Sequence, residues 1–202
     1  MKEKIYIDFD GTLYNSDKFY TDFLEIYANY NISKDIVENE MAKLFATNHL
    51  FNPTLLSKHL CQKYHLPPTI TQKVEELYHI PNLYVDVLEG LELIKQTNKY
   101  EINILTYGQL DHQTKKIKFS KAMPYINNII VTSNSKIGLK EIDYQNSIFI
   151  DNNPNQIEQL VKYGVKKIFR IRRATDKYST QKVSNNIKEY PDFLTLVKKE
   201  LI

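Results

Sequence analysis

The sequence predicts an α/β fold, a Rossmann-like parallel sheet with helices on both faces and a small inserted helical cap. Short segments rich in Ile, Val and Phe alternate with amphipathic helical patterns along much of the chain, which is typical of a parallel sheet with helical crossovers. Between residues 13 and 82 the alternation stops and only helical periodicity continues. These two observations predict a sheet-based core domain with one helical insertion.

Five segments have the length and composition of buried strands. The first, Ile5–Ile7, runs directly into two carboxylates and a glycine. Four later segments, each bounded by polar residues, are predicted as further strands: Glu101–Leu105, Asn128–Thr132, Ser147–Ile150 and Lys167–Ile171. Amphipathic helices are predicted before, between and after these strands: Leu83–Lys95, Asp111–Ser120 and Pro154–Tyr163.

The predicted core domain consists of residues 1–12 and 83–202, and the inserted cap consists of residues 13–82. In the insertion, apolar side chains such as Phe19, Phe23 and Tyr27 recur at helical spacing. Modules inserted in this way often close over an active site. We therefore expect the cap to control access to a site at the end of the first strand.

Composition is that of an ordinary globular protein. The chain has 202 residues, 42% of them hydrophobic, and a net charge of +3. This mild basicity is more typical of a solvated surface than of a nucleic-acid-binding protein, and we interpret the basic run from Lys166 to Arg173 as a solvated strand edge. Cys61 is the single cysteine, which suits a reducing compartment. With no apolar run of membrane-spanning length and no signal peptide, we expect a cytoplasmic protein without a membrane partner.

Polar residues follow several of the predicted strands where each strand ends. Asp8 and Asp10 follow the first strand, Thr106 the second and Asp151 the fourth. Because ligands of open parallel sheets bind at the carboxyl ends of the strands, we expect these groups to share one site. Asp8 and Asp151 are suitable ligands for Mg²⁺, which prefers oxygen and is usually held by one or two carboxylates, waters and substrate phosphate.

The same residues are suited to phosphoryl transfer. Aspartate forms acyl-phosphate intermediates in such enzymes, so Asp8 is the candidate nucleophile. Asp10 lies two residues further on, on the same side of an extended segment, and is the candidate general acid and base. The Thr106 hydroxyl and an ammonium group would stabilise the charge on the phosphoryl oxygens.

The segment from Asp8 to Thr12 reads Asp-Phe-Asp-Gly-Thr and resembles the first motif, Asp-x-Asp-x-Thr, of phosphatases in the haloacid dehalogenase superfamily. The apolar strands that end at Thr106 and at Asp151 are similar to the second and fourth motifs. The resemblance spans roughly residues 4–172, and the helical insertion is similar to the alpha-helical cap of that family.

This resemblance implies a magnesium site with named ligands. Asp8, Asp151 and the backbone carbonyl of Asp10 would hold the ion, with Asp8 as the nucleophile and Asp10 as the acid and base. Asn152 stands where the family often has a second acid. Because a similar Asp-Asn pair occurs in the protein-phosphatase branch, Asn152 is a further candidate ligand, directly or through water.

The resemblance also implies a phosphate-binding group made of Thr106, Tyr107 and a lysine. Two lysines compete for the third position, and Lys136 is preferred over Lys140 because it directly follows the third strand and its polar turn. Tyr107 stands where many relatives have Asn, so contacts to the leaving group are expected to differ.

These features predict a Mg²⁺-dependent phosphatase that hydrolyses a small phosphomonoester, of the nucleotide or sugar phosphate class, through an aspartyl-phosphate. A phosphomutase or phosphotransferase of the same fold is the alternative enzyme, and a non-catalytic binding or regulatory protein of this fold is the alternative from another class. A dehalogenase is disfavoured because its chemistry has no use for Asp10 as an acid. Processing of nucleic-acid ends rests on the basic run alone, and the sequence does not predict the oligomeric state.

Overall fold

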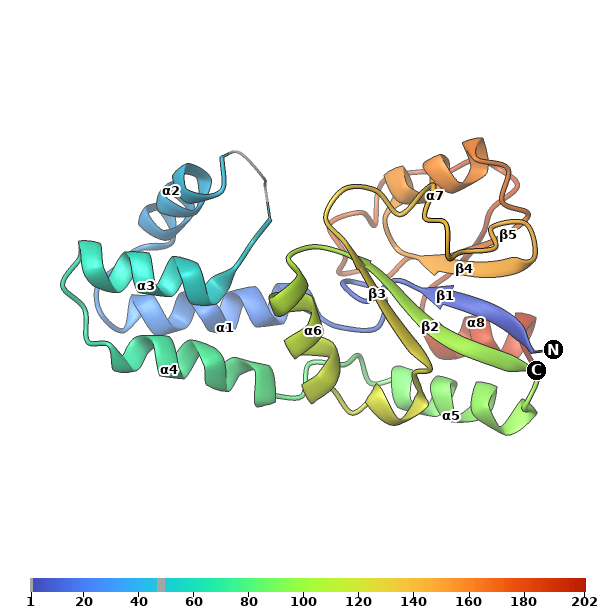
Figure 1. The fold of residues 1–202 in the computed structure, drawn as a ribbon, viewed down its shortest axis with the longest axis horizontal. Coiled ribbons are helices and arrows are strands. Elements are labelled where there is room, and N and C mark those ends of the chain that lie inside the picture. The colour runs from blue at the N-terminus through green and yellow to red at the C-terminus, as the bar shows by residue number, and fades with distance from the viewer. Residues whose placement is uncertain (1, 47–49) are drawn as a thin grey trace.

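This computed structural model describes residues 2–46 and 50–202. At the centre of the core lies a six-stranded parallel sheet with the strand order β3-β2-β1-β4-β5-β6 (Figure 1). The first strand lies inside the sheet, between β2 and β4. The strands are β1 (Glu3–Ile7), β2 (Tyr100–Tyr107), β3 (Asn128–Thr132), β4 (Ser147–Asp151), β5 (Lys167–Ile171) and β6 (Lys188–Tyr190).

Helices cover both faces of the sheet. On one face α5 and α8 pack over Ile5 and Ile7, and on the other α7 packs near Tyr6. Alternate residues of a strand point to opposite faces, so a strand buried on both sides is apolar throughout. The α-helices are α1 (Ser16–Ala28), α2 (Lys34–Leu44), α3 (Pro53–Lys63), α4 (Thr69–Glu76), α5 (Val87–Thr97), α6 (Leu110–Phe119), α7 (Pro154–Lys162) and α8 (Phe193–Glu200), with 3₁₀ turns η1 (Leu77–His79) and η2 (Met123–Tyr125).

The helices α1 to α4 lie beside the sheet and not on its faces, with α6 next to them (Figure 1). The chain leaves and re-enters the sheet through two connections that run antiparallel. Tyr14 pairs with Leu83, and the Asn15 amide donates to the Asn82 carbonyl at 2.7 Å. The helical module therefore begins within a few residues of Asp8.

The structure confirms the predicted fold class and all five predicted strands, with small shifts of their ends. The helix predicted from Leu83 begins instead at Val87, because Leu83 and Tyr84 are held by hydrogen bonds to the outgoing connection. The prediction lacked β6 and α8, whose three-residue strand and eight-residue helix give weak periodic signals. The domain boundaries remain a prediction.

Within the described ranges, no helix has the length and apolar character needed to cross a lipid bilayer.

Candidate active site

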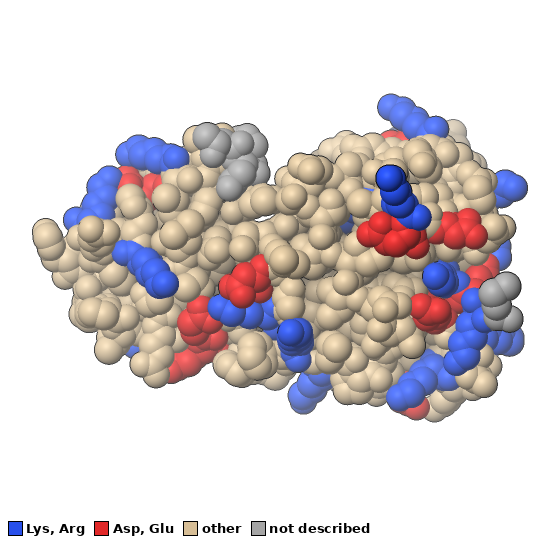
Figure 2. Space-filling view, in the orientation of Figure 1, with Lys and Arg blue, Asp and Glu red and all other residues tan. Residues whose placement is uncertain are grey.

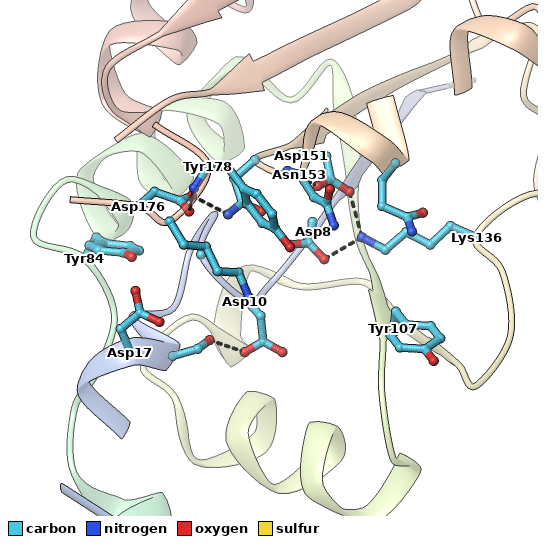
Figure 3. A pocket seen from close by; sticks show the side chains of 15 residues that line it. Asp8, Asp10, Asp17, Tyr84, Tyr107, Lys136, Asp151, Asn153, Asp176 and Tyr178 are labelled. Carbon is cyan, nitrogen blue, oxygen red and sulfur yellow. Dashed lines mark hydrogen bonds and ion pairs between the residues drawn. The ribbon is translucent and has the colours of Figure 1, made fainter. Parts of the chain in front are cut away.

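The carboxyl ends of the central strands surround a cavity of about 210 Å³ (Figure 3). Asp8 is the first residue after β1, and Asp151 is the last residue of the neighbouring strand β4. Lys136 reaches the same cavity from the loop that follows β3. Asp10, Tyr107 and Asn152 also line this cavity, so the fold brings six of the predicted site residues together.

An ion-pair triad occupies the floor of the cavity. The Lys136 Nζ donates to Asp8 Oδ1 at 2.6 Å and to Asp151 Oδ2 at 2.7 Å, and all three side chains are buried. Tyr144 fixes the loop by donating its hydroxyl to the Lys136 carbonyl at 2.6 Å. Burial disfavours the Lys136 charge, but Asp151 and Asp8 raise the pKa of this ammonium overall. Lys136 is therefore charged at neutral pH.

The surroundings of Asp8 change the pKa of its carboxyl group. Burial raises the pKa of Asp8 above its usual range, Lys136 lowers it, and the nearby Asp151 raises it again. Two buried carboxylates thus share one ammonium. A further cation at this place would stabilise the ionised form of Asp8.

Asp10 is held by a separate set of donors. Its Oδ1 accepts hydrogen bonds from Lys116 Nζ and, at 2.5 Å, from Ser16 Oγ, while its Oδ2 accepts from Gln113 Nε2 at 2.7 Å. Burial opposes ionisation of Asp10, but Lys116 and the three hydrogen bonds lower its pKa to about 2. Asp10 is consequently a carboxylate at neutral pH in this conformation.

The residues that clamp Asp10 belong to none of the predicted motifs. Gln113 and Lys116 are buried, and their spacing of three places them on one face of α6. The signal that could have identified them is that two polar residues share the inward face of a short helix. Ser16 opens α1, so the clamp joins the helical module to the core.

The predicted phosphate-binding residues differ in placement. Lys136 lies at the two carboxylates, whereas Lys140 is exposed and has no part in the cavity lining. Tyr107 lines the cavity and is 39% exposed. Thr106, one residue earlier in β2, is fully buried and is absent from the cavity lining, and its hydroxyl has no hydrogen-bond partner among the described residues.

Replacing Thr106 with Val tests this unpartnered hydroxyl. The two side chains have nearly the same shape, so the free energy of unfolding is expected to stay unchanged or to rise by up to about 1 kcal/mol as a buried unsatisfied group is removed. If the hydroxyl binds substrate phosphate, hydrolysis should fall by about 100-fold. Chemical denaturation and steady-state kinetics measure the two effects. Unchanged kinetics would leave Thr106 with a packing role only.

The donors at the cavity floor fit a magnesium ion. Asp8 and Asp151 supply carboxylate oxygens, and among the described residues no hydrogen bond reaches the Asp10 carbonyl oxygen. Asn152 contributes an amide oxygen that lies 3.4 Å from the Thr12 hydroxyl. No group of three His, Cys, Asp or Glu side chains in the described ranges has the arrangement of a metal site. A site built here would therefore use carboxylates together with neutral oxygens and water, the set that Mg²⁺ commonly takes.

The basic run near β5 is solvated only in part: Lys166, Lys167 and Arg172 are exposed as predicted, whereas the other two basic residues are not. Arg170 is fully buried, and Arg173, also buried, pairs with Asp86 at 2.9 Å. Each guanidinium fixes backbone next to the cavity, since Arg170 donates to the Asn152 carbonyl and Arg173 to the Thr12 carbonyl. On the face shown in Figure 2, basic side chains are scattered among acidic and uncharged ones. Both arginines therefore serve the architecture of the site.

Neither protein family models nor curated sequences match this chain. Solved structures do match over almost its whole length. A putative haloacid dehalogenase-like hydrolase from Burkholderia xenovorans LB400 has a TM-score of 0.75 at 12% identity, covering 99% of this chain and 97% of its own. The putative hydrolase YfnB from Bacillus subtilis, bound to magnesium, has a TM-score of 0.63 at 13% identity and covers 98% and 97%. A putative beta-phosphoglucomutase from Thermotoga maritima has a TM-score of 0.65 at 11% identity and covers 98% and 100%.

The matching structures also include L-2-haloacid dehalogenases. At these identities the similarity concerns architecture and not chemistry. It confirms the fold that the motifs implied: this chain has the fold of the haloacid dehalogenase-like hydrolases.

Proposed function

We propose that this protein is a Mg²⁺-dependent phosphatase that hydrolyses a small phosphomonoester through an aspartyl-phosphate on Asp8. The observation that carries the proposal is the pair of differently held carboxylates in one cavity. Asp8 is bound to Lys136 at the floor, and Asp10 is bound to Lys116 at the side. A dehalogenase needs only the first of these groups, so the clamped Asp10 favours phosphoryl transfer.

In the first step, one Asp8 carboxylate oxygen attacks phosphorus, and the bond from phosphorus to the leaving oxygen breaks. Lys136 lies within hydrogen-bond distance of Asp8 and Asp151 and would also offset the negative charge of the phosphoryl group. Asp8, Asp151 and the Asp10 carbonyl would hold Mg²⁺, which supplies further charge stabilisation at the phosphoryl oxygens.

Asp10 would protonate the leaving oxygen and then take a proton from the water that hydrolyses the acyl-phosphate. Because its pKa is low, Asp10 is ionised and so has the protonation state that the second role needs. For the first role it must carry a proton, and the negative charge of an arriving phosphate favours this by raising the pKa of a neighbouring carboxyl. Substrate binding and proton uptake are therefore coupled in this proposal.

A second cavity of about 360 Å³ adjoins the first and gives room for the leaving group. Asp10, Ser16 and Tyr107 line both cavities. The second is also lined by Phe19 and Phe51, next to polar α6 residues. Such a mixture suits a leaving group with both apolar and hydroxylated surfaces, consistent with the nucleotide or sugar phosphate class.

Replacing Lys116 with Met should change the pH profile of the reaction. Lys116 lowers the pKa of Asp10 while burial raises it, so loss of the ammonium moves that pKa upward. As the pH is lowered, the step that needs ionised Asp10 is then lost at a higher pH than in the wild type. The acid limb of kcat should therefore move to higher pH.

An aryl phosphate is the appropriate substrate for this profile, because its leaving oxygen needs little protonation. Lys115→Met is the matched control, since Lys115 lies beside Lys116 in α6 but pairs with Glu75 at 3.0 Å. Its acid limb should coincide with that of the wild type. If Lys116→Met leaves the acid limb in place, Asp10 is not the group that the profile reports.

The proposed function is tested by incubating the protein with an aryl phosphate in the presence of Mg²⁺ or of EDTA. Metal-dependent phosphate release is expected, and its absence would contradict the enzyme hypothesis and favour the non-catalytic alternative. A panel of nucleotides, sugar phosphates and 3′-phosphorylated oligonucleotides then compares substrate classes. Isomerised sugar phosphate without free phosphate would favour the phosphomutase alternative.

A further inference from the structure

A buried polar chain connects the loop after β5 to the candidate nucleophile. Asp176 lies in that loop and accepts a hydrogen bond at Oδ2 from Asn152 Nδ2 at 2.5 Å (Figure 3). The other end of the same amide, Asn152 Oδ1, lies 3.4 Å from Thr12 Oγ1. Thr12 in turn lies 3.3 Å from Asp8 Oδ2. Asp176 belongs to none of the motifs predicted from the sequence.

The chemistry of Asp176 and Asn152, which form a hydrogen-bonded pair, determines which way the side-chain amide of Asn152 faces. An ionised carboxylate accepts hydrogen bonds and cannot donate them, while an amide has one donating end and one accepting end. The NH₂ group of Asn152 must therefore face Asp176, and its oxygen faces the Thr12 hydroxyl, which lies between Asn152 and Asp8. Without Asp176, the amide would be free to turn and present hydrogen atoms to the nucleophile.

Both members of the pair are fixed from several sides. The second oxygen of Asp176 accepts from the Tyr178 amide at 2.9 Å. Fully buried Arg170 donates to the Tyr178 carbonyl at 2.7 Å and to the Asn152 carbonyl at 3.3 Å, so one guanidinium holds both segments.

Packing at Gly11 also confines the Asn152 side chain. Gly11 has a φ of +77°, and a Cβ there would lie 2.2 Å from Asn152 Nδ2. The chain leaves just enough space at this position for the amide. A pair held so closely is suited to a precise positioning task.

We propose that Asp176 is a positioning residue, which turns the Asn152 amide oxygen toward Asp8 and so completes the oxygen donors of the cation site. The proposal rests on the proposed function, because it concerns the Mg²⁺ of that reaction. Residues that orient ligands in this way typically change metal affinity 10- to 100-fold when replaced. Asp176 should therefore affect metal binding more than the chemical step.

The experiment measures Mn²⁺ binding by electron paramagnetic resonance in the wild type, Asp176→Ala, Asn152→Ala and the double variant. Each single change is expected to weaken binding by about tenfold, and the double variant should bind no more weakly than Asn152→Ala. A carboxylate that acted only through its charge would instead add its effect in both backgrounds. In kinetics, Asp176→Ala should raise the Mg²⁺ concentration for half-maximal rate by a larger factor than it lowers kcat at saturating Mg²⁺.

Two further variants keep the test specific. The exchange Asn152→Asp with Asp176→Asn reverses the hydrogen bond but preserves it, and should restore Mn²⁺ binding to at least the wild-type level. Asp143→Ala is the matched control, because Asp143 accepts from the Asn146 amide at 2.9 Å on an exposed turn. Its Mn²⁺ affinity should be unchanged. Thermal unfolding verifies that each variant is folded.

The proposal is overturned if Asp176→Ala binds Mn²⁺ as the wild type does, if the two alanine effects add, or if the exchange fails to restore binding. These results would leave the proposed function intact wherever the wild type hydrolyses the aryl phosphate with Mg²⁺. Failure of the wild type to bind Mn²⁺ would overturn both the cation site and the role of Asp176.

Discussion

Replacing Asp8 with Asn is expected to lower phosphate release by about 10⁴-fold or more, the scale seen when a catalytic nucleophile is removed. An amide oxygen is a poor nucleophile and forms no acyl-phosphate, so the reaction loses its covalent route. Lys136 still finds an oxygen acceptor in the substituted side chain, which preserves the local geometry. The loss should therefore appear in kcat at saturating Mg²⁺ and substrate.

Stability provides a separate readout for the same variant. Burial raises the pKa of Asp8, which means that the folded protein favours the neutral form of this side chain. A neutral amide should consequently leave the melting temperature at pH 8 and in EDTA unchanged or higher. Loss of activity together with unfolding would point to a structural role instead.

Asp111→Asn is the control for this experiment, since Asp111 is an exposed carboxylate at the start of α6. Its hydrolysis rate should remain within about twofold of the wild type, as is usual for exposed sites. If Asp8→Asn retained more than about one tenth of the wild-type rate, another group would have to be the nucleophile.

Periodicity and local motifs were sufficient for most of the fold. Strands buried on both faces are apolar throughout, so β1, β4 and their neighbours could be recognised from single segments. The alternation of strands and helices then predicted a parallel sheet, but the order of its strands was not predicted. Elements with few apolar residues were not predicted. The strand β6, for example, is held in place by its pairing with β5 and not by its own composition.

The candidate site likewise contains some residues that could be predicted from the sequence and others that could not. Asp8 and Asp151 could be predicted because each lies at the carboxyl end of an apolar strand, which determines where the carboxylate lies. Lys116 and Asp176 could not, because each reaches the cavity through tertiary contacts, from a helix face and a loop. The burial of Arg170 could not be predicted either, because it depends on the loop that follows β5.

Replacing Lys136 with Met is expected to have the second-largest effect, on both activity and stability. Hydrolysis should fall by about 10²- to 10³-fold, because the charge that stabilises the phosphoryl oxygens is lost. In EDTA at pH 8 the free energy of unfolding should fall by about 3–5 kcal/mol, since Asp8 and Asp151 are left buried without a counter-charge. Lys140→Met is the matched control: this lysine lies in the same loop but is exposed, and its replacement should change neither quantity.

The pH dependence of the loss identifies its cause. Lys136 lowers the pKa of Asp8, so its removal raises that pKa further above the unfolded value of about 4. An acid with a raised folded-state pKa binds more protons when folded, and stability then falls as pH rises through the folded-state pKa. Asp8 already has a pKa of about 7 in the wild-type fold, so it is neutral in both proteins at low pH. The Lys136→Met penalty should consequently be smallest below about pH 7 and grow above it, with a slope of up to about 1.4 kcal/mol per pH unit. Denaturation curves that extend from the acid side to well above this pKa measure the slope. A penalty that is the same at every pH would mean that Lys136 stabilises the fold through packing, and that the two carboxylates do not depend on its charge.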